Sequence, residues 1–226
     1  MVVPAEIVAQ VRTSLAAVAV PEDAEPMAAY MKNQFPFLGV KTPARRAAVK
    51  PLMKAAKEWS NHDLLGVAEA LMAEPEREFS FVAADLLRKW ARNLTSGDLG
   101  SVRALIETKS WWDTVDALAV HVVGPIVRAD PSLQVDMDRW IEDDNIWVAR
   151  TAILHQLMWK DQTDAERLFR YCDLRAADTQ FFIRKALGWA LRQYARTDPD
   201  AVRTYVEANE DRLSGLTKRE AMRWIT

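Results

Sequence analysis

Helical spacing of apolar residues, unbroken by any strand pattern, is the feature that most constrains the fold of this chain. No segment shows sustained alternation of apolar and polar residues. The connections are short and carry turn signals such as Glu74-Pro75, Ser96-Gly97, Asp130-Pro131 and Asp198-Pro199. Glycine is scarce, with 7 in 226 residues, while Ala, Leu, Arg and Glu are abundant. We therefore predict an all-α protein.

The expected helices follow one another with little chain between them. One is expected to open at Thr42-Pro43, with Thr as cap and Pro at the first position, and another near Thr217. The others are expected at about 4–19, 23–34, 61–73, 75–93, 97–108, 110–128, 131–142, 145–159, 163–175, 179–196 and 199–213.

Large aromatic residues recur at a fixed interval. Trp112, Trp147 and Phe182 lie 35 residues apart, each near the start of the second helix of a pair. Such a period is typical of helical repeats of the HEAT kind, in which each pair buries its apolar face on its neighbours. We predict a superhelical solenoid of paired antiparallel helices, formed by residues 1–226 as a single domain.

Charge alternates between the helices of a pair. Segments 145–160 and 179–197 contain Arg and Lys but no acid, whereas 130–144 is strongly acidic. In a solenoid, the second helices would line one surface, so we expect a concave basic groove suited to a polyanion despite the formal net charge of -2.

A basic stretch runs from Lys41 to Lys57, with six basic residues and no acid. Arg46, Lys50, Lys54 and Lys57 follow helical spacing. The stripe is either a solvated face or a set of phosphate contacts.

Two tryptophans and two carboxylates stand together in Lys109–Asp116. Ser110 fits an N-cap, and Asp113 has capping-box spacing from it. Asp116 has no capping role and shares a helix face with Trp112, while Trp111 falls on the apolar stripe. A carboxylate set among cations is expected to stay ionised, where it can stabilise a developing positive charge or orient water.

Other chemistries fit poorly. The three histidines lack zinc-ligand spacing, Cys172 fits a small core residue, and no phosphate-binding glycine motif is present. We expect no metal and no cofactor. The single cysteine and the absence of a signal sequence or a long apolar run indicate a cytoplasmic protein without a membrane segment. Nothing in the sequence demands a partner subunit, so we expect a monomer.

Several segments together resemble the AlkD family of alkylpurine DNA glycosylases, which are bacterial DNA alkylation repair enzymes with HEAT-like repeats. The matching segments are 24–33, 37–46, 109–116, 144–150, 181–194 and 216–221, and the run Lys-Ser-Trp-Trp-Asp-x-Val-Asp at 109–116 is the most distinctive.

The resemblance implies hydrolysis of the N-glycosidic bond of cationic N3- and N7-alkylated purines, such as 3-methyladenine and 7-methylguanine, in double-stranded DNA. It places the key carboxylate on Asp116 and the flanking aromatics on Trp112 and Trp189. Supporting arginines, which the resemblance implies hold DNA phosphates, fall on Arg150 and Arg192. Further cleft positions fall on Tyr30 and Lys41, the latter being Gln in the family pattern. The remaining expected DNA contacts are Arg45, Arg46, Lys50 and Lys185.

Two other functions stay open at this point. One is a HEAT-like protein that binds DNA or senses damage without excision, and the other is a scaffold for protein partners. The acid-free second helices disfavour the scaffold.

Overall fold

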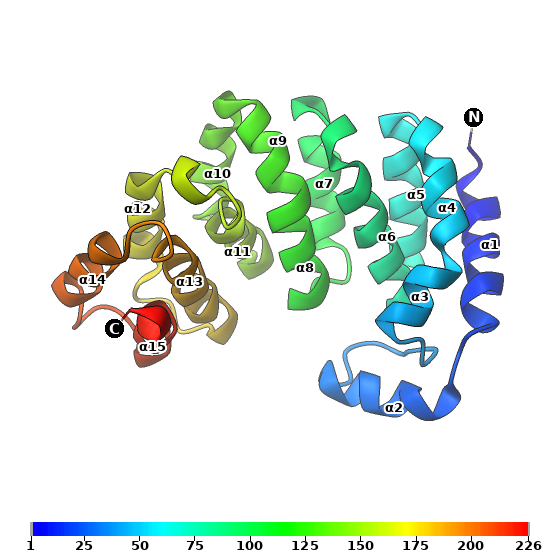
Figure 1. Cartoon of the computed structure of the whole chain (residues 1–226), viewed down its shortest axis with the longest axis horizontal. Coiled ribbons are helices and arrows are strands. Elements are labelled where there is room, and N and C mark those ends of the chain that lie inside the picture. Colours follow the sequence, from blue (N-terminus) through cyan, green and yellow to red (C-terminus); the bar gives the residue numbers. More distant parts are fainter. Residues whose placement is uncertain (1, 226) are drawn as a thin grey trace. The chain divides into compact units, whose positions relative to one another are not determined.

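The computed structural model describes residues 2–225, and these residues form helices joined by turns and loops, without a strand (Figure 1). The all-α prediction is therefore confirmed. Within the described residues, none of the helices combines the length and the apolar character needed to cross a membrane.

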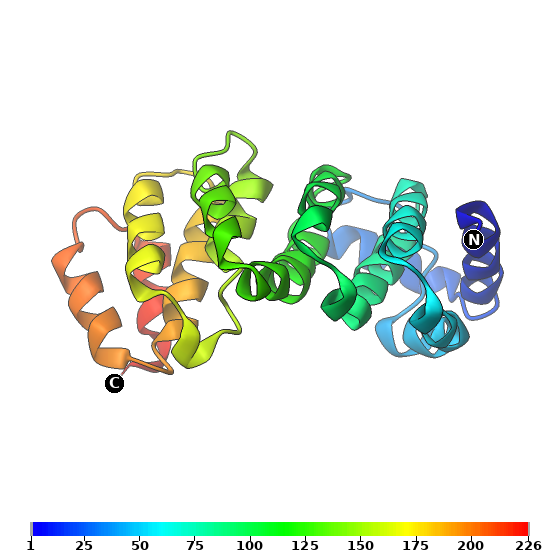
Figure 2. The ribbon, with the colours of Figure 1, turned by 90° about the horizontal axis from the view of Figure 1, so that it is seen from above.

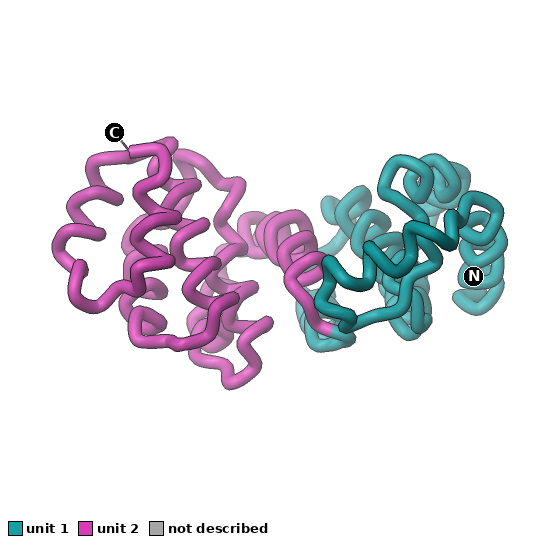
Figure 3. Tube along the Cα trace, turned by 90° about the horizontal axis from the view of Figure 1, so that it is seen from below, with its two compact units in different colours: residues 1–109 teal, residues 110–226 magenta. Residues whose placement is uncertain are grey.

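The chain divides into two compact units, which meet in sequence between Lys109 and Ser110 (Figure 3). We call them unit 1 and unit 2 and describe each by itself. The single domain, the superhelical arrangement and the concave groove stay predictions.

Unit 1 is built around α5. This helix packs against α1, α6 and α7, and it buries Leu64, Val67, Leu71 and Met72 in the core. The side chain of Ser60 caps α5 by accepting from the backbone N–H of Asp63 at 3.1 Å. The helices of unit 1 are α1 (Pro4–Ala16), α2 (Pro21–Tyr30), α3 (Thr42–Ala48), α4 (Lys50–Ala55), α5 (Asn61–Ala73), α6 (Arg77–Trp90) and α7 (Leu99–Glu107).

The basic stretch does not form one continuous helix. It breaks at Val49 into α3 and α4, because Pro51 lies in the first turn of α4 and cannot donate a backbone hydrogen bond to the preceding turn. The prediction of a single stripe from Arg46 to Lys57 is therefore wrong in its geometry.

Unit 2 contains a row of successive contacts from α8 to α11, from α11 to α13, and from α13 to α15. Helix α13 also packs against α12 and α14 (Figures 1 and 2). The helices of unit 2 are α8 (Trp112–Leu118), α9 (Gly124–Ala129), α10 (Gln134–Trp140), α11 (Ile146–Leu154), α12 (Ala165–Arg175), α13 (Phe181–Tyr194), α14 (Pro199–Ala208) and α15 (Gly215–Ala221).

Helices α8 and α9 form one helical run, joined by a π-helical turn, η4 (Ala119–Val123). Three members of its expected apolar stripe, Val115, Leu118 and Val122, lie in the core, and the fourth, Trp111, is half-buried. The N-cap differs from the prediction. Trp111, rather than Ser110, occupies that position in an extended conformation, and Asp113 Oδ1 instead accepts from the adjacent N–H of Thr114 at 2.9 Å.

Candidate active site

A cavity of about 350 Å³ opens on unit 2 along the row of α8, α11 and α13. Helix α8 contributes Asp116 and Trp112, α11 contributes Arg150, and α13 supplies the remaining residues. The lining is mainly aromatic and cationic, with one carboxylate: Trp112, Asp116, Arg150, Phe181, Phe182, Lys185, Trp189 and Arg192.

Asp116 is held by a bidentate ion pair at the wall of this cavity. Arg150 Nε donates to Oδ1 and Nη2 donates to Oδ2, each at 2.7 Å. Arg150 is almost completely buried, with a side-chain exposure of 3%, while Asp116 keeps 14%. The third guanidinium nitrogen, Nη1, donates to the backbone carbonyl of Phe182. Arg150 thus connects α11 to both α8 and α13 and fixes the plane of the carboxylate.

Burial raises the pKa of Asp116 above its ordinary value of 3.8, although the hydrogen bonds and charge of Arg150 act in the opposite direction. The nearby Asp113 adds a smaller upward effect. The carboxylate was expected to stay ionised because of the surrounding cations, and its loss of water on burial opposes that effect. The result is a more basic carboxylate than a solvated one, in a cavity where its charge is poorly screened.

The two adjacent tryptophans separate into different environments. Trp111 packs against Trp147 and Phe182, with ring centroids 5.5 and 5.0 Å away, and those two rings lie 4.9 Å from each other. Trp112 instead lines the cavity beside Asp116. The 35-residue spacing had grouped Trp112 with Trp147 and Phe182, but the ring cluster contains Trp111.

One face of α13 presents a cation, an aromatic ring and a second cation to the cavity. Lys185, Trp189 and Arg192 follow i, i+4, i+7 spacing and therefore share this face. Behind the two cations lies Glu220 of α15, which accepts from Lys185 Nζ at 2.5 Å and from Arg192 Nη1. The Lys185 hydrogen bond is the main reason why the pKa of Glu220 lies below its ordinary value.

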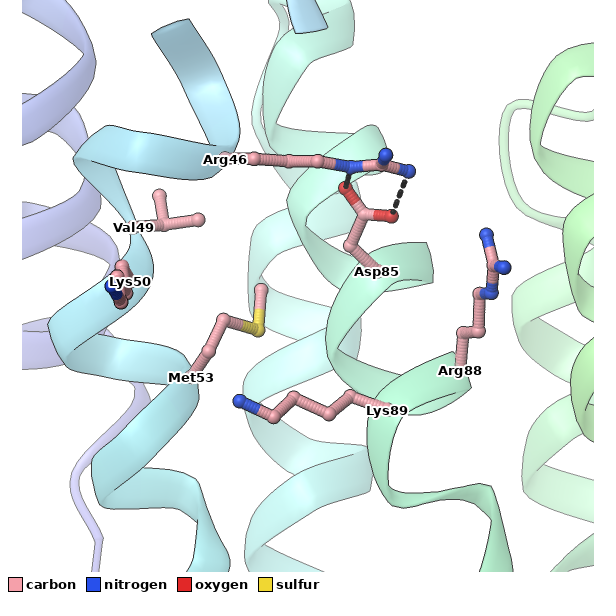
Figure 4. A pocket seen from close by; sticks show the side chains of 7 residues that line it. All are labelled: Arg46, Val49, Lys50, Met53, Asp85, Arg88 and Lys89. Atoms are coloured by element: carbon pink, nitrogen blue, oxygen red, sulfur yellow. Dashed lines mark hydrogen bonds and ion pairs between the residues drawn. The ribbon is translucent and has the colours of Figure 1, made fainter. Parts of the chain in front are cut away.

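Unit 1 carries a separate basic groove of about 370 Å³ between α3–α4 and α6 (Figure 4). Arg46 and Lys50, both expected as phosphate contacts, line it, and Val49 and Met53 form an apolar part of its wall. Helix α6 adds Asp85, Arg88 and Lys89, which were not predicted from the sequence. Within residues 2–225, Lys50 and Arg88 have no ion-pair partner. Lys54 and Lys57 do not line the groove.

Arg45 occupies a different position from its neighbour Arg46. Its side chain is only 7% exposed, its Nη2 donates to Asp85 Oδ2 at 3.2 Å, and its guanidinium lies 4.7 Å from the Phe81 ring centroid. Asp85 also binds Arg46 through Oδ1 at 3.2 Å. The basic stretch therefore does have a counter-charge, supplied by a helix about 40 residues further along the chain.

Tyr30 and Lys41 line a third hollow, of about 300 Å³, beside α2 in unit 1. Tyr30 is strongly exposed, at 70%. Lys41 Nζ donates to Asp23 Oδ1 at 2.7 Å, so its ammonium is held at the edge of this hollow.

Cysteine and histidine, the other residue types considered for chemistry, include two deeply buried side chains. Cys172 is fully buried, and burial raises the pKa of its thiol, which agrees with its assignment to the core. Burial also lowers the pKa of His155 to about 4. Among the described residues, no group of three His, Cys, Asp or Glu side chains is placed to hold a metal ion.

Comparisons with known proteins cover most of the chain. The sequence model of a family described as DNA alkylation repair enzyme matches residues 11–225. A solved structure described as a predicted DNA alkylation repair enzyme from Enterococcus faecalis is 33% identical in sequence, with a TM-score of 0.86. That match covers 92% of this chain and 97% of the other. No curated protein matches the sequence significantly.

Proposed function

The chain belongs to the family of DNA alkylation repair enzymes, and on this premise we propose that it is a monofunctional DNA glycosylase for cationic N3- and N7-alkylpurines in double-stranded DNA. The observation that carries the proposal is the single carboxylate of the unit 2 cavity, Asp116, which faces a space lined by aromatic rings and cations.

The substrate supplies much of the driving force. An N3- or N7-alkylpurine is positively charged, so the C1′–N bond breaks with its electron pair moving to the base, which leaves neutral. The sugar then becomes oxocarbenium-like at C1′. An enzyme for this reaction must stabilise the sugar cation and deliver water, and it needs no strong acid for the leaving group.

Asp116 is suited to both tasks. Each of its oxygens accepts one hydrogen bond from Arg150, and a carboxylate oxygen has a further lone pair available. The free lone pairs stabilise positive charge at C1′ and accept a hydrogen bond from the attacking water. Because burial raises the pKa of Asp116, it is also a better acceptor for the proton released when water adds to C1′. Arg150 was expected to hold a DNA phosphate, but it is almost completely buried against Asp116. We therefore propose that it acts through Asp116 by fixing the orientation of the carboxylate.

The aromatic and cationic residues would hold the nucleotide. Trp112 and Trp189 offer flat apolar surfaces for the deoxyribose, and Lys185 and Arg192 offer donors to the flanking phosphates. In unit 1, we propose Tyr30, Lys41, Arg45, Arg46 and Lys50 as further contributors to DNA contact. Arg46 and Lys50 are exposed to solvent, whereas the buried Arg45 would act mainly through Asp85. No metal or cofactor takes part in the proposed reaction, and a monomer suffices for it.

The second candidate is a DNA-binding or damage-sensing protein without excision activity. The bidentate Asp116–Arg150 pair favours it, because an ion pair of this geometry can serve structure alone. Both candidates predict DNA binding, so binding does not separate them.

The test is release of free base. Double-stranded DNA containing 7-methylguanine is incubated with the protein, and free base and abasic sites are measured against undamaged DNA and against the protein-free reaction. A glycosylase gives base and abasic sites in equal amounts, without strand cleavage. Binding to the methylated DNA with release only at the spontaneous rate would establish the second candidate instead.

A further inference from the structure

Lys185 and Arg192 are both anchored from behind by one carboxylate on a different helix. Glu220 of α15 bridges them, and its side chain is 12% exposed, against 39% for Lys185 and 19% for Arg192. The carboxylate is thus more buried than either cation. The cations are more exposed, and they line the cavity together with Trp189, which lies between them along α13.

The position of Glu220 is set by a close approach of α13 and α15. A Cβ atom placed on Gly188 would lie 2.5 Å from Glu220 Cβ and 2.9 Å from the Thr217 carbonyl oxygen, so only glycine allows this spacing. Thr217 Oγ1 also donates to the Arg184 carbonyl at 3.1 Å. These contacts place Glu220 directly against the cationic face of α13.

The bridge leaves most of the hydrogen-bonding capacity of both cations unused. A lysine ammonium has three donors and an arginine guanidinium has five, and Glu220 accepts one from each. The remaining donors are available to phosphate oxygens. One carboxylate between two cations also leaves this part of the cavity with a net positive charge, which suits an anionic ligand.

We infer that Glu220 is a positioning residue of the cavity: it holds the charged ends of Lys185 and Arg192 next to one another beside Trp189, so that backbone phosphates of the lesion-bearing strand meet cations already in place. This inference rests on the proposed function. Without the bridge, both long side chains would sample many rotamers. Their conformational entropy would then be lost when DNA binds, at a cost to correct alignment of the nucleotide. The carboxylate therefore contributes to alignment of the nucleotide and lowers the charge available for loose binding.

The test compares Glu220→Gln with Glu210→Gln. The first substitution keeps size and shape but removes the charge that orders the cations. The second makes the same chemical change in unit 2 at an exposed side chain, whose carboxylate lies 3.8 Å from Lys218 Nζ. Single-turnover release of 7-methylguanine, the affinity for intact DNA and the midpoint of thermal unfolding are measured for both variants and the wild type.

We expect Glu220→Gln to slow base release at saturating protein by about tenfold while it binds intact DNA as tightly as the wild type or more tightly. Glu210→Gln should match the wild type in all three measurements. A wild-type release rate in Glu220→Gln would overturn the inference. A parallel loss of rate, affinity and thermal midpoint would overturn it as well, because that pattern marks a general structural role.

A second readout separates this inference from the proposed function. The affinity for DNA carrying a tetrahydrofuran abasic-site analogue is compared with the affinity for intact DNA. The ratio of these two affinities should be about tenfold smaller for Glu220→Gln than for the wild type. If the wild type releases no base but this loss is seen, the glycosylase proposal fails and the positioning role stands. If release is normal and Glu220→Gln keeps the full preference, the positioning role fails alone.

Discussion

At the scale of single residues, the Asp116–Arg150 pair joins two opposed properties. The carboxylate is desolvated enough to have a raised pKa, yet both its oxygens are bound by a guanidinium. Burial makes the charge energetically costly, and the arginine offsets part of that cost while fixing the direction of the free lone pairs. A change in pH and the removal of Arg150 should therefore have different effects on the stability and activity of the protein.

The pH dependence follows from the raised pKa. Between 3.8 and the pKa of Asp116 in the folded protein, the folded state binds the proton more readily than the unfolded chain. The contribution of this group to stability is therefore present at low pH and is lost as the pH rises through the folded pKa. The pH dependence of activity has the opposite sign. Activity is expected to rise with pH, because the reaction needs the ionised carboxylate.

We accordingly expect the enzyme-dependent rate of base release to fall as the pH drops through a midpoint above 3.8. The measurement is a pH–rate profile for 7-methylguanine release at saturating protein, with the spontaneous rate subtracted at each pH. A fall in rate centred at or below pH 3.8 would show that burial does not raise the pKa of the reacting carboxylate.

Removal of the cation should affect folding strongly. Arg150→Ala leaves a buried carboxylate without its partner and deprives the Phe182 carbonyl of a donor, so we expect the free energy of unfolding to fall by about 3 kcal/mol. Urea denaturation measures this. The control is Arg196→Ala, since Arg196 is an exposed arginine outside the cavity, where little change is expected. Equal stability of the two variants would mean that the pair contributes nothing net to the fold.

At the scale of helices, the most informative contact is the approach of α15 to α13 at Gly188. Gly188→Ala would force Glu220 and the Thr217 carbonyl away from α13, and we expect a loss of about 1–3 kcal/mol in unfolding free energy. Gly100→Ala is the matched control. Apart from its chain neighbours and its own helical backbone, no atom of the described residues lies within 4 Å of the added Cβ. Higher helix propensity should therefore stabilise the protein by about 0.5–1 kcal/mol. If both substitutions changed the unfolding free energy in the same direction, the proposed close packing at Gly188 would be contradicted.

The sequence predicts helices best where start and stop signals act locally. Helix α5 has the predicted bounds, 61–73, because Ser60 caps it and Pro75 follows its end. The break at Val49 was missed, because the charge pattern continues through Pro51 while the backbone does not. The N-cap at Trp111 was missed for a related reason: a Ser at the correct spacing permits a cap but does not compel one.

In the candidate site, too, local spacing was predicted correctly, whereas contacts between distant helices were not. Helical spacing alone put Asp116 beside Trp112 and Trp189 beside Arg192, and the structure gathers these four residues around one cavity. The partners Asp85 and Glu220 could not be found in this way. They come from helices 28–40 residues distant along the chain, and only packing decides which acid meets which cation.

At the scale of the whole molecule, a formal net charge of -2 is compatible with DNA binding because the basic side chains are concentrated locally. Each unit has its own cationic hollow, one with Arg46, Lys50 and Arg88 and the other with Lys185 and Arg192. The proposed function includes a contribution of unit 1 to DNA contact, and this can be tested without disturbing the Asp116 cavity.

The double substitution Arg46→Ala, Lys50→Ala should weaken binding to all DNA sequences alike. It should also flatten the dependence of log Kobs on log salt by about 0.9 for each phosphate that the variant no longer neutralises. Lys54→Ala, Lys57→Ala removes the same charge from the same stretch but outside the groove, so its effect should be smaller. Fluorescence anisotropy over a salt series measures both. Identical slopes for the two variants would mean that the groove has no specific part in binding.

The central claim is that the carboxylate of Asp116 carries the reaction, and its most direct test is single-turnover release of 7-methylguanine by Asp116→Asn and Asp113→Asn. The two substitutions make the same chemical change three residues apart on α8, and only Asp116 lines the cavity. We predict a fall in rate of about 100-fold or more for Asp116→Asn, with DNA binding retained, and a rate near that of the wild type for Asp113→Asn. Equal rates for Asp116→Asn and the wild type would contradict the account.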